Sequence, residues 1–286
     1  MKVLIAGSAG QLGRALQATA PANVTVIAPP EVDFDICDPE AVARVVAAAA
    51  PALVINAAAY TAVDKAETEA AAAQRVNVNA VGLLASAARN AGAGFVHVST
   101  DFIFDGTAHL PYPPDALPNP LGVYGRTKLE GEEAARDLHG NPLIVRTAWV
   151  YAAKGANFVA TMLRLMRERS ELGVVADQIG TPTHVPTLAR TIWTLAQGGH
   201  TGTFHATDAG VASWYDFAVA IHEEALALGL LTTPVTVKPI RTSDYPTPAQ
   251  RPAYSVLDKS ATWALTGLPN HWRVELRACL QELARG

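Results

Sequence analysis

Short apolar runs and longer amphipathic stretches alternate along the first half of the chain. Five apolar runs have the length and composition of strands: Lys2–Ala6, Val24–Ala28, Leu53–Asn56, Phe95–Val98 and Leu143–Arg146. Helical periodicity begins between them, near Gln11, Pro39, Glu67 and Leu121. Strands that alternate with helices are typical of an α/β fold. We therefore predict a doubly wound parallel sheet with helices on both faces.

The alanine-rich stretch from Ala70 to Asn90 is predicted to form one helix packed across this sheet. Asn77 and Asn79 in its middle are unusual because asparagine is a poor helix former. They are either a polar pair that faces solvent or a pair of which one supports a functional site from below. The sequence leaves both interpretations open.

The second half of the chain has a different character, with many prolines and short, irregular strands. Four further helices are expected, at Ala156–Arg169, Pro186–Gln197, Trp214–Leu228 and Trp272–Ala284. We predict a nucleotide-binding domain over residues 1–150, to which some later segments return, and a smaller, mainly helical cap over residues 151–286. A cleft between two such parts is a common place for a ligand.

The composition is that of an ordered globular protein, with 50% hydrophobic and 17% charged residues. The net charge is -4 and no basic cluster appears, which argues against nucleic-acid binding. No apolar run has the length of a membrane span, and a strand starts directly after Met1, which leaves no room for a signal peptide. Cys37 and Cys279 offer neither a disulfide framework nor a zinc site, so we expect a cytoplasmic protein without metal.

A glycine-rich turn, Gly7-Ser-Ala-Gly10-Gln-Leu-Gly13, follows the first predicted strand. Gly7 allows a tight turn, Gly10 lets a phosphate approach the backbone, and Gly13 lets the next helix lie close to the sheet. The start of that helix offers free N–H groups and a positive dipole end to a pyrophosphate. The spacing differs from the usual G-x-G-x-x-G fingerprint, and the alternative is a turn that binds nothing. The strand before it and the helix after it favour a dinucleotide site.

Tyr124 and Lys128 are four residues apart, so they share one face of the predicted helix. A free tyrosine titrates at about pH 10, and we expect the nearby ammonium to lower that pKa. The triplet Ser99-Thr100-Asp101 ends a predicted strand, where ligands bind in open parallel sheets. Its hydroxyls can hydrogen-bond a carbonyl oxygen. A Tyr/Lys pair alone often arises by chance on exposed helices, but together with the glycine turn it favours a nicotinamide-dependent enzyme.

These motifs resemble the extended short-chain dehydrogenase/reductase family, and the resemblance runs nearly end to end. It is carried by Gly7–Gly13, Asn56–Glu67, Ser99–Gly106, Val123–Lys128, Arg146–Tyr151, Asp177–Thr183 and Tyr245–Pro252. The segments past residue 140 are typical of the branch that reduces 4-keto-deoxysugar nucleotides. The resemblance implies a Rossmann-type domain with a substrate-binding cap. It also implies reduction of the C4 keto group of dTDP-4-dehydro-L-rhamnose to dTDP-L-rhamnose by hydride transfer from NADPH or NADH.

The resemblance also implies roles for single residues. Tyr124 would protonate the C4 oxygen as general acid, Lys128 would orient the nicotinamide ribose, and Thr100 would replace the common serine. Thr100, Asp101 and Trp149 would lie at the sugar nucleotide, although a tryptophan in such a loop is more often core packing. Cofactor contacts are implied for Gly7, Gly10, Gln11, Leu12, Gly13, Asp35, Ile36, Ala59, Tyr60, Thr61, Tyr124 and Lys128.

Two departures from the family pattern concern a metal and the cofactor. Many relatives hold magnesium between subunits with acidic residues, whereas the matching positions here are Ala15 and Pro186. We therefore expect no magnesium and a monomer or weak homodimer. The second strand is followed by Ala28-Pro29-Pro30-Glu31, where neither an acidic residue for NADH nor an arginine for NADPH is clearly placed. The preferred cofactor is left open.

Two other functions remain as alternatives. One is a non-catalytic regulatory subunit with a Rossmann fold, although such a protein has no need of Tyr124, Lys128 and Thr100. The other is a different sugar-nucleotide epimerase, dehydratase or reductase. A dehydratase usually has an acid pair beside the threonine, but Thr100-Asp101-Phe102 supplies one acid only, which favours simple reduction.

Overall fold

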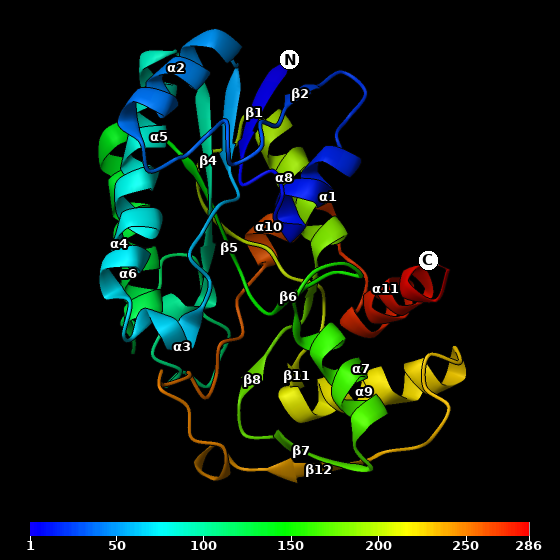
Figure 1. The fold of residues 1–286 in the computed structure, drawn as a ribbon. Coiled ribbons are helices and arrows are strands. Elements are labelled where there is room, and N and C mark those ends of the chain that lie inside the picture. The colour runs from blue at the N-terminus through cyan, green and yellow to red at the C-terminus, as the bar shows by residue number, and fades with distance from the viewer. Residues whose placement is uncertain (286) are drawn as a thin grey trace.

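The computed structural model describes residues 1–285 as a larger body and a smaller lobe below it (Figure 1). The larger body is built on one six-stranded sheet, in the order β10 (Gly202–His205), β5 (Leu143–Thr147), β4 (Gly94–Thr100), β3 (Leu53–Asn56), β1 (Lys2–Ala6) and β2 (Thr25–Ile27). Every neighbouring pair of strands runs parallel. The predicted doubly wound parallel sheet is confirmed.

Helices cover both faces of this sheet, because its central strands are apolar on both sides. Side chains alternate along β1, so that Val3 and Ile5 join one core and Leu4 joins the other. The first core lies under α1 (Gln11–Ala18) and α8 (Val185–Gln197). The second lies under α2 (Pro39–Ala49), α5 (Ala80–Asn90) and α6 (Val123–His139). Figure 1 shows these two helical layers on either side of the strands.

The predicted helix over residues 70–90 is present, but it is not regular. It consists of α4 (Ala70–Gln74), a π-helical turn at Arg75–Asn79 and α5. A π turn contains one extra residue and is common at functional sites. It leaves Asn77 buried and Asn79 exposed, so the two asparagines do not form a solvent-facing pair.

Two helix starts differ from the expectation. A short helix, α3 (Val63–Ala66), lies before Glu67, and α6 begins at Val123 rather than near Leu121. Glu67 explains the start of α6. The carboxylate of Glu67 accepts a hydrogen bond from the Val123 backbone N–H at 2.8 Å, while Gly122, the residue before the helix, has no side chain to cap it. Glu67 therefore caps the first turn of a helix 56 residues later in the chain.

The lower lobe contains three helices and three pairs of short strands. Its helices are α7 (Phe158–Glu168), α9 (Trp214–Ala227) and α11 (Trp272–Arg285). The strand pairs are β7 (Glu171–Val175) with β12 (Thr236–Ile240), β8 (Ile179–Gly180) with β11 (Ala212–Ser213), and β6 (Val150–Tyr151) with β9 (Thr183–His184). A separate apolar core centred on Tyr151, Phe217 and Trp272 holds the lobe together.

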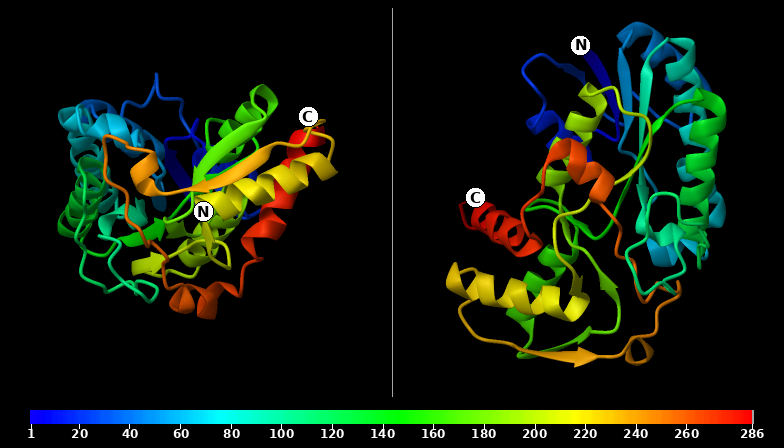
Figure 2. Two further views of the ribbon diagram at one scale, coloured as in Figure 1. Left: turned by 90° about the horizontal axis from the view of Figure 1, so that it is seen from below. Right: turned by 180° about the vertical axis from the view of Figure 1, so that it is seen from behind.

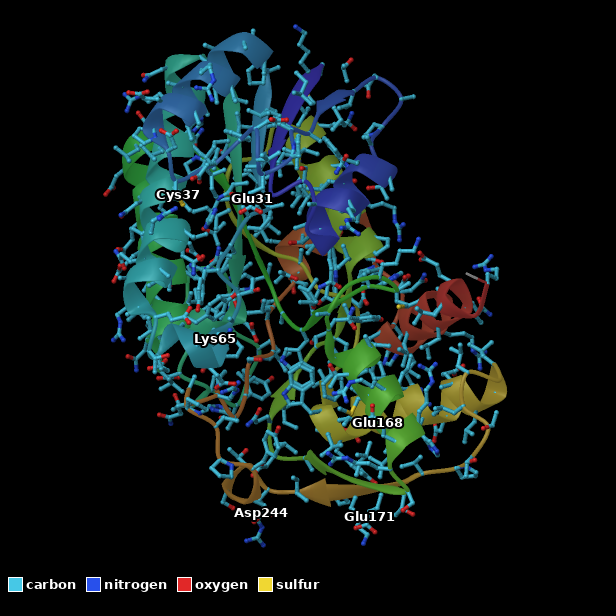
Figure 3. All side chains as sticks on the ribbon, in the orientation of Figure 1. Glu31, Cys37, Lys65, Glu168, Glu171 and Asp244 are labelled. Atoms are coloured by element: carbon cyan, nitrogen blue, oxygen red, sulfur yellow. The ribbon has the colours of Figure 1, made fainter. Side chains whose placement is uncertain are left out.

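The chain crosses between the two parts more than once (Figure 2). After β9 it returns to the larger body as α8 and β10, and it comes back again as α10 (Ser260–Thr266), which packs beside α8. A division near residue 150 therefore stays a prediction. Figure 3 shows Glu31 and Cys37 on the larger body, and Glu168, Glu171 and Asp244 on the lower lobe. No helix within residues 1–285 is long and apolar enough to cross a membrane.

Candidate active site

The three glycines of the first turn have different surroundings. A Cβ on Gly13 would lie 2.1 Å from the carbonyl oxygen of Gly7, so Gly13 allows α1 to pack against the turn. Gly7 has a φ of +77° and lies against the backbone of Ala58, a conformation and space that suit glycine alone. A Cβ on Gly10 would meet only the Gly7 oxygen, at 3.3 Å. Gly10 is therefore the glycine that faces open space.

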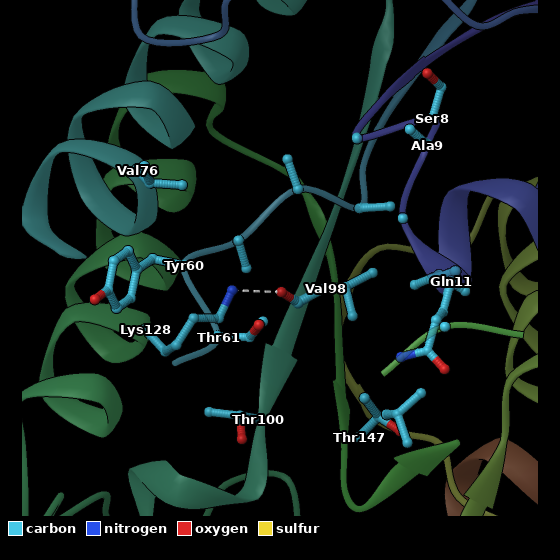
Figure 4. A pocket seen from close by; sticks show the side chains of 18 of the residues that line it. Ser8, Ala9, Gln11, Tyr60, Thr61, Val76, Val98, Thr100, Lys128 and Thr147 are labelled. Carbon is cyan, nitrogen blue, oxygen red and sulfur yellow. Dashed lines mark hydrogen bonds between the residues drawn. The ribbon is translucent and has the colours of Figure 1, made fainter. Parts of the chain in front are cut away.

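The turn opens into a cavity of about 1390 Å³ that reaches from the loop after β2 to the start of the lower lobe. The predicted site residues that line it are Gly7, Gly10, Gln11, Leu12, Asp35, Ile36, Ala59, Tyr60, Thr61, Thr100, Asp101, Tyr124, Lys128 and Trp149. Gly13 is the one member of the predicted set that does not line the cavity. Figure 4 shows Gln11, Tyr60, Thr100 and Lys128 around this space.

The cavity suits a dinucleotide at its glycine end. Gly10 stands directly before α1 and offers no capping side chain, so the first N–H groups of the helix are free for an anion. The volume also exceeds the range of about 300–1,000 Å³ that is usual for a single small ligand. The residues present therefore fit a dinucleotide together with a second ligand.

The far end of the cavity holds charges of both signs. Glu31, Asp35 and Arg75 all line it, and Arg75 lies 3.8 Å from Asp35. Both partners of this pair are more than half exposed, so the pair contributes little to stability. Arg14 lines the cavity as well, so that arginines and carboxylates are both available and the geometry favours neither a ribose hydroxyl nor a ribose phosphate.

Asn77 supports the site from the π turn. Its Oδ1 accepts a hydrogen bond from the Tyr60 N–H at 2.9 Å, and its Nδ2 donates to the Tyr60 carbonyl at 3.2 Å. Nδ2 also lies 3.1 Å from Oγ1 of Thr127 on α6. One buried amide thus fixes the loop Ala59–Thr61 relative to α6. The Tyr60 hydroxyl donates to Glu69 outside the cavity, which Tyr60 also lines.

Tyr124 lies in the first turn of α6 and faces the end of β4. Desolvation raises the pKa of Tyr124 to about 12; a hydrogen bond with Thr100 opposes this rise and the charge of Asp101 adds to it. The expected lowering by Lys128 is wrong for this structure. The reason is the burial of Tyr124, while Nζ of Lys128 is held by the Val98 carbonyl and the His97 ring. A raised pKa keeps the phenol protonated, as a proton donor requires.

Lys128 is 2% exposed and reaches the cavity from α6, beside β4. Its Nζ donates to the Val98 carbonyl oxygen at 2.7 Å, the contact drawn in Figure 4. Burial lowers the pKa of Lys128 to about 8, although the Glu132 carboxylate one turn later favours the charged form. Lys128 therefore changes its charge near neutral pH. Sequence reasoning identified this lysine but not its partner His97.

Thr100 and Asp101 end β4 at the cavity. Oγ1 of Thr100 donates to Oδ1 of Asp101 at 3.1 Å and accepts the Phe102 N–H at 3.2 Å. Burial raises the pKa of Asp101 to about 6, against hydrogen bonds from Ser255 and Thr100. The neighbouring strand places Thr147 directly beside Thr100, which adds a second hydroxyl to this edge. The edge is therefore rich in groups that can hydrogen-bond a polar ligand.

Trp149 follows β5 at the junction of the two parts. Its φ of +47° is in the left-handed region, which a bulky residue rarely adopts. The indole stacks on that of Trp214 with centroids 3.5 Å apart, and Gly180 leaves the space in which it lies. Backbone strain of this kind is found at ligand sites. Trp149 is thus both packed on the lobe and exposed to the cavity.

Ala15 and Pro186, the two positions considered above for a metal site, have apolar side chains. Ala15 is buried in the core between α1 and the sheet, and Pro186 lies in the first turn of α8. In the part of the chain that the structure describes, no three His, Cys, Asp or Glu side chains are grouped so that they could hold a metal ion.

Comparisons with known proteins agree on one family. The sequence model of the family described as "RmlD substrate binding domain" matches residues 1–285. The dTDP-4-dehydrorhamnose reductase of Burkholderia thailandensis is 43% identical, over 99% of both chains. The crystal structure of a dTDP-4-dehydrorhamnose reductase from Clostridium acetobutylicum superimposes with a TM-score of 0.93 at 42% identity, over 99% of both chains. That of the Bacillus anthracis reductase in complex with NADP does so with a TM-score of 0.92 at 36% identity, over 98% of this chain and 99% of that one.

Proposed function

The chain belongs to the family of the RmlD substrate binding domain, and we propose that it reduces the C4 keto group of dTDP-4-dehydro-L-rhamnose to dTDP-L-rhamnose with NADPH or NADH. One observation carries this proposal. Tyr124, Lys128 and Thr100 line the same cavity as the free glycine turn, so a proton donor and a dinucleotide cradle share one space. The cofactor, when bound, supplies the hydride.

The remaining steps belong to the protein. Tyr124, kept protonated by its raised pKa, donates its proton to the C4 oxygen as the carbonyl carbon accepts the hydride, so that the ketone becomes an alcohol. The Thr100 hydroxyl, which donates to Asp101 in the free protein, would turn to donate to the same oxygen and so orient it. Lys128 would donate from Nζ to a ribose hydroxyl, while Trp149 and Asp101 would bind the sugar nucleotide. The first turn of α1 and Gly10 would hold the pyrophosphate.

The adenosine end would lie along Asp35, Ile36 and the loop Ala59–Thr61, which line the cavity beyond the glycine turn. Since Glu31 and Arg75 are both present there, we propose that the enzyme accepts NADPH and NADH alike. The proposal includes a cytoplasmic enzyme, in keeping with its two free cysteines, and a monomer or weak homodimer. The non-catalytic alternative is not favoured, because the relatives at about 40% identity carry the names of reductases.

The test is an assay at 340 nm with dTDP-4-dehydro-L-rhamnose and each reduced cofactor. We expect oxidation of the cofactor that depends on the sugar nucleotide. In Tyr124→Phe we expect turnover to fall by about 10²–10⁴-fold, the usual contribution of a general acid, with cofactor affinity retained. Tyr245→Phe is the matched control, because Tyr245 is 61% exposed and lies outside the cavity. Near wild-type turnover by Tyr124→Phe would remove Tyr124 from the proposed role.

A further inference from the structure

His97 is buried in the middle of β4 between two other buried polar side chains. Its Nδ1 lies 3.2 Å from Nδ2 of Asn56, and its Nε2 lies 3.3 Å from Nζ of Lys128. Asn56 and His97 have no exposed surface and Lys128 is 2% exposed. Because bulk water does not reach the ring, the three side chains must satisfy one another's hydrogen bonds.

The orientation of the Asn56 amide is fixed by the backbone. Its Oδ1 accepts a hydrogen bond from the Ala58 N–H at 3.1 Å, so its NH₂ group faces the His97 ring. Turning the amide over would place NH₂ against the Ala58 N–H, where two donors would meet. Nδ1 of His97 must therefore act as the acceptor.

A neutral His97 ring carries one N–H, and only Nε2 remains for it. With Nδ1 accepting, the hydrogen is on Nε2 and points at Nζ of Lys128. An ammonium has three donors and no lone pair, so it cannot accept that hydrogen, whereas a neutral amine can. Nζ also donates to the Val98 carbonyl, which leaves the amine one further hydrogen for a ligand in the cavity.

We propose that Asn56 and His97 act as a tautomer lock on Lys128, a positioning pair that favours its neutral amine over its ammonium. The hydrogen bonds alone lead to this assignment of the Lys128 amine. Its contribution to turnover rests on the function proposed above. With its lone pair held by His97 and one hydrogen held by Val98, the amine presents its last hydrogen to the cavity in a fixed direction.

The charged groups around the pair agree with this assignment. Burial is the largest cause that holds the pKa of His97 well below its usual range; the charge of Lys128 adds to it whenever the lysine is protonated, and that of Arg136 adds to it as well, so the ring is neutral with either form of the lysine. The Glu132 carboxylate favours the ammonium of Lys128, but Arg146 and Arg136 both pair with it. Tyr124, in the preceding turn of α6, is neutral up to a pKa of about 12. Burial remains the largest influence on Lys128, and the lock acts in the same direction.

The experiment reads the tautomer directly. Protein with ¹⁵N-labelled histidine, free of cofactor and substrate, is studied by long-range ¹H–¹⁵N correlation NMR from pH 6 to pH 10, and His97 is assigned with His97→Gln. At pH 10 we expect a protonated Nε2 and an unprotonated Nδ1. We expect the His97 signals to change as Lys128 gains its proton at lower pH, since the lock must then reorganise. A ring protonated at Nδ1 at pH 10 would overturn the proposal.

Asn56→Asp reverses the lock with little change of shape. The carboxylate still accepts the Ala58 N–H, but it now requires a proton on Nδ1, so Nε2 becomes an acceptor for the ammonium. We expect the titration of Lys128 to move up by about one pH unit or more, a tenfold change in proton affinity. Asn79→Asp, which adds the same charge at an exposed site of the neighbouring helix, should leave it unchanged.

His97→Gln provides a second variant should Asn56→Asp fail to fold. Its amide can turn to suit either form of the lysine, so the titration of Lys128, followed by ¹⁵N-labelled lysine, should again move to higher pH. An unchanged titration in both variants would contradict the proposal. None of these measurements uses the reductase assay, so failure of the proposed function and failure of the lock are separate results.

Discussion

The three glycines of the first turn, Gly7, Gly10 and Gly13, have different roles, which follow from what a side chain would meet at each position. Gly13 and Gly7 are enclosed by backbone at 2.1 Å and 2.6 Å from an added Cβ, whereas Gly10 faces the cavity. Enclosed glycines support the fold, and the open one supports binding. The same distinction applies to the polar residues of the site, where Asn77 and His97 act on other residues and Tyr124 and Thr100 face the cavity.

Substitution of these glycines should therefore give opposite results. We expect Gly10→Val to fold normally and to lose dinucleotide binding, because its side chain would occupy the place of the pyrophosphate. We expect Gly13→Ala to lower stability by several kcal/mol, an overpacking effect, because its Cβ would overlap the Gly7 carbonyl. Thermal melting and calorimetric titration with NADPH and NADH separate the two effects. A folded Gly10→Val protein with undiminished affinity would exclude this turn from the cofactor site.

At the scale of whole elements, α6 is positioned by contacts along its first three turns. The N–H of its first residue, Val123, is capped by Glu67, and a Cβ on Gly131 would lie 2.1 Å from the Asn77 carbonyl, so α6 packs directly on the π turn. Gly125 packs equally closely on the carbonyl of Phe102. These contacts leave α6 little freedom to shift. The helix that carries Tyr124 and Lys128 is thus fixed against both the sheet and its neighbour.

Removal of the distant cap tests this view of α6. We expect Glu67→Ala to lose about 1 kcal/mol of stability, as for other lost caps, and to lower turnover because Tyr124 follows the capped residue. Glu67→Gln keeps an acceptor and should recover most of both. Glu69→Ala is the control, since Glu69 is exposed and contacts Tyr60 rather than α6. Equal effects of the alanine changes at 67 and 69 would show that the cap has no special role.

The loop between β5 and β6 carries Trp149, whose substitution should affect substrate binding. We expect Trp149→Ala to raise the KM for the sugar nucleotide about tenfold or more, with a smaller effect on cofactor affinity, because an indole offers a large flat surface to a sugar or base. Trp214 supports the indole from behind, so Trp214→Ala should mainly lower the melting temperature. Melting temperature and KM are measured on the same preparations. A purely thermal effect of Trp149→Ala would assign this side chain to packing alone.

On the scale of the whole molecule, the alternation of apolar runs was enough to predict five of the six strands of the sheet, because buried parallel strands are apolar throughout. The edge strand β10 (Gly202–His205) was not predicted, since its residues form no apolar run. The glycine turn and the Tyr/Lys pair were equally readable, since their chemistry depends on short spacings. The π turn was not, because Asn77 finds its partners Tyr60 and Thr127 at distances of 17 and 50 residues. The raised pKa of Tyr124 was not predicted for a similar reason. Burial, its largest cause, is a property of the fold and not of the Tyr/Lys spacing. His97 and Asn56 carried one weak signal, a polar residue within an apolar strand.

We predict that neither the activity nor the assembly of the protein depends on a bound metal. We expect EDTA to change neither the activity nor the molar mass in light scattering, because Ala15 and Pro186 supply no oxygen ligand of the kind magnesium needs. Samples with added magnesium serve as the reference. A loss of mass together with a loss of activity after chelation would show a metal-dependent dimer.

The return of the chain to the sheet has a consequence for the order in which the protein can fold during synthesis. β10 ends at His205 and pairs with β5, whose residues Leu143 to Thr147 are buried on the finished protein. Until residue 205 has left the ribosome, β5 is an edge strand with an unpaired row of backbone groups and an apolar surface that α8 does not yet cover. Helix α7 and strand β7 of the lower lobe are made during that interval, whereas β12, the partner of β7, follows only after it. A chain stopped near residue 150 would therefore expose the backbone edge and the apolar face of β5. We expect such a fragment to aggregate rather than to form an independent domain.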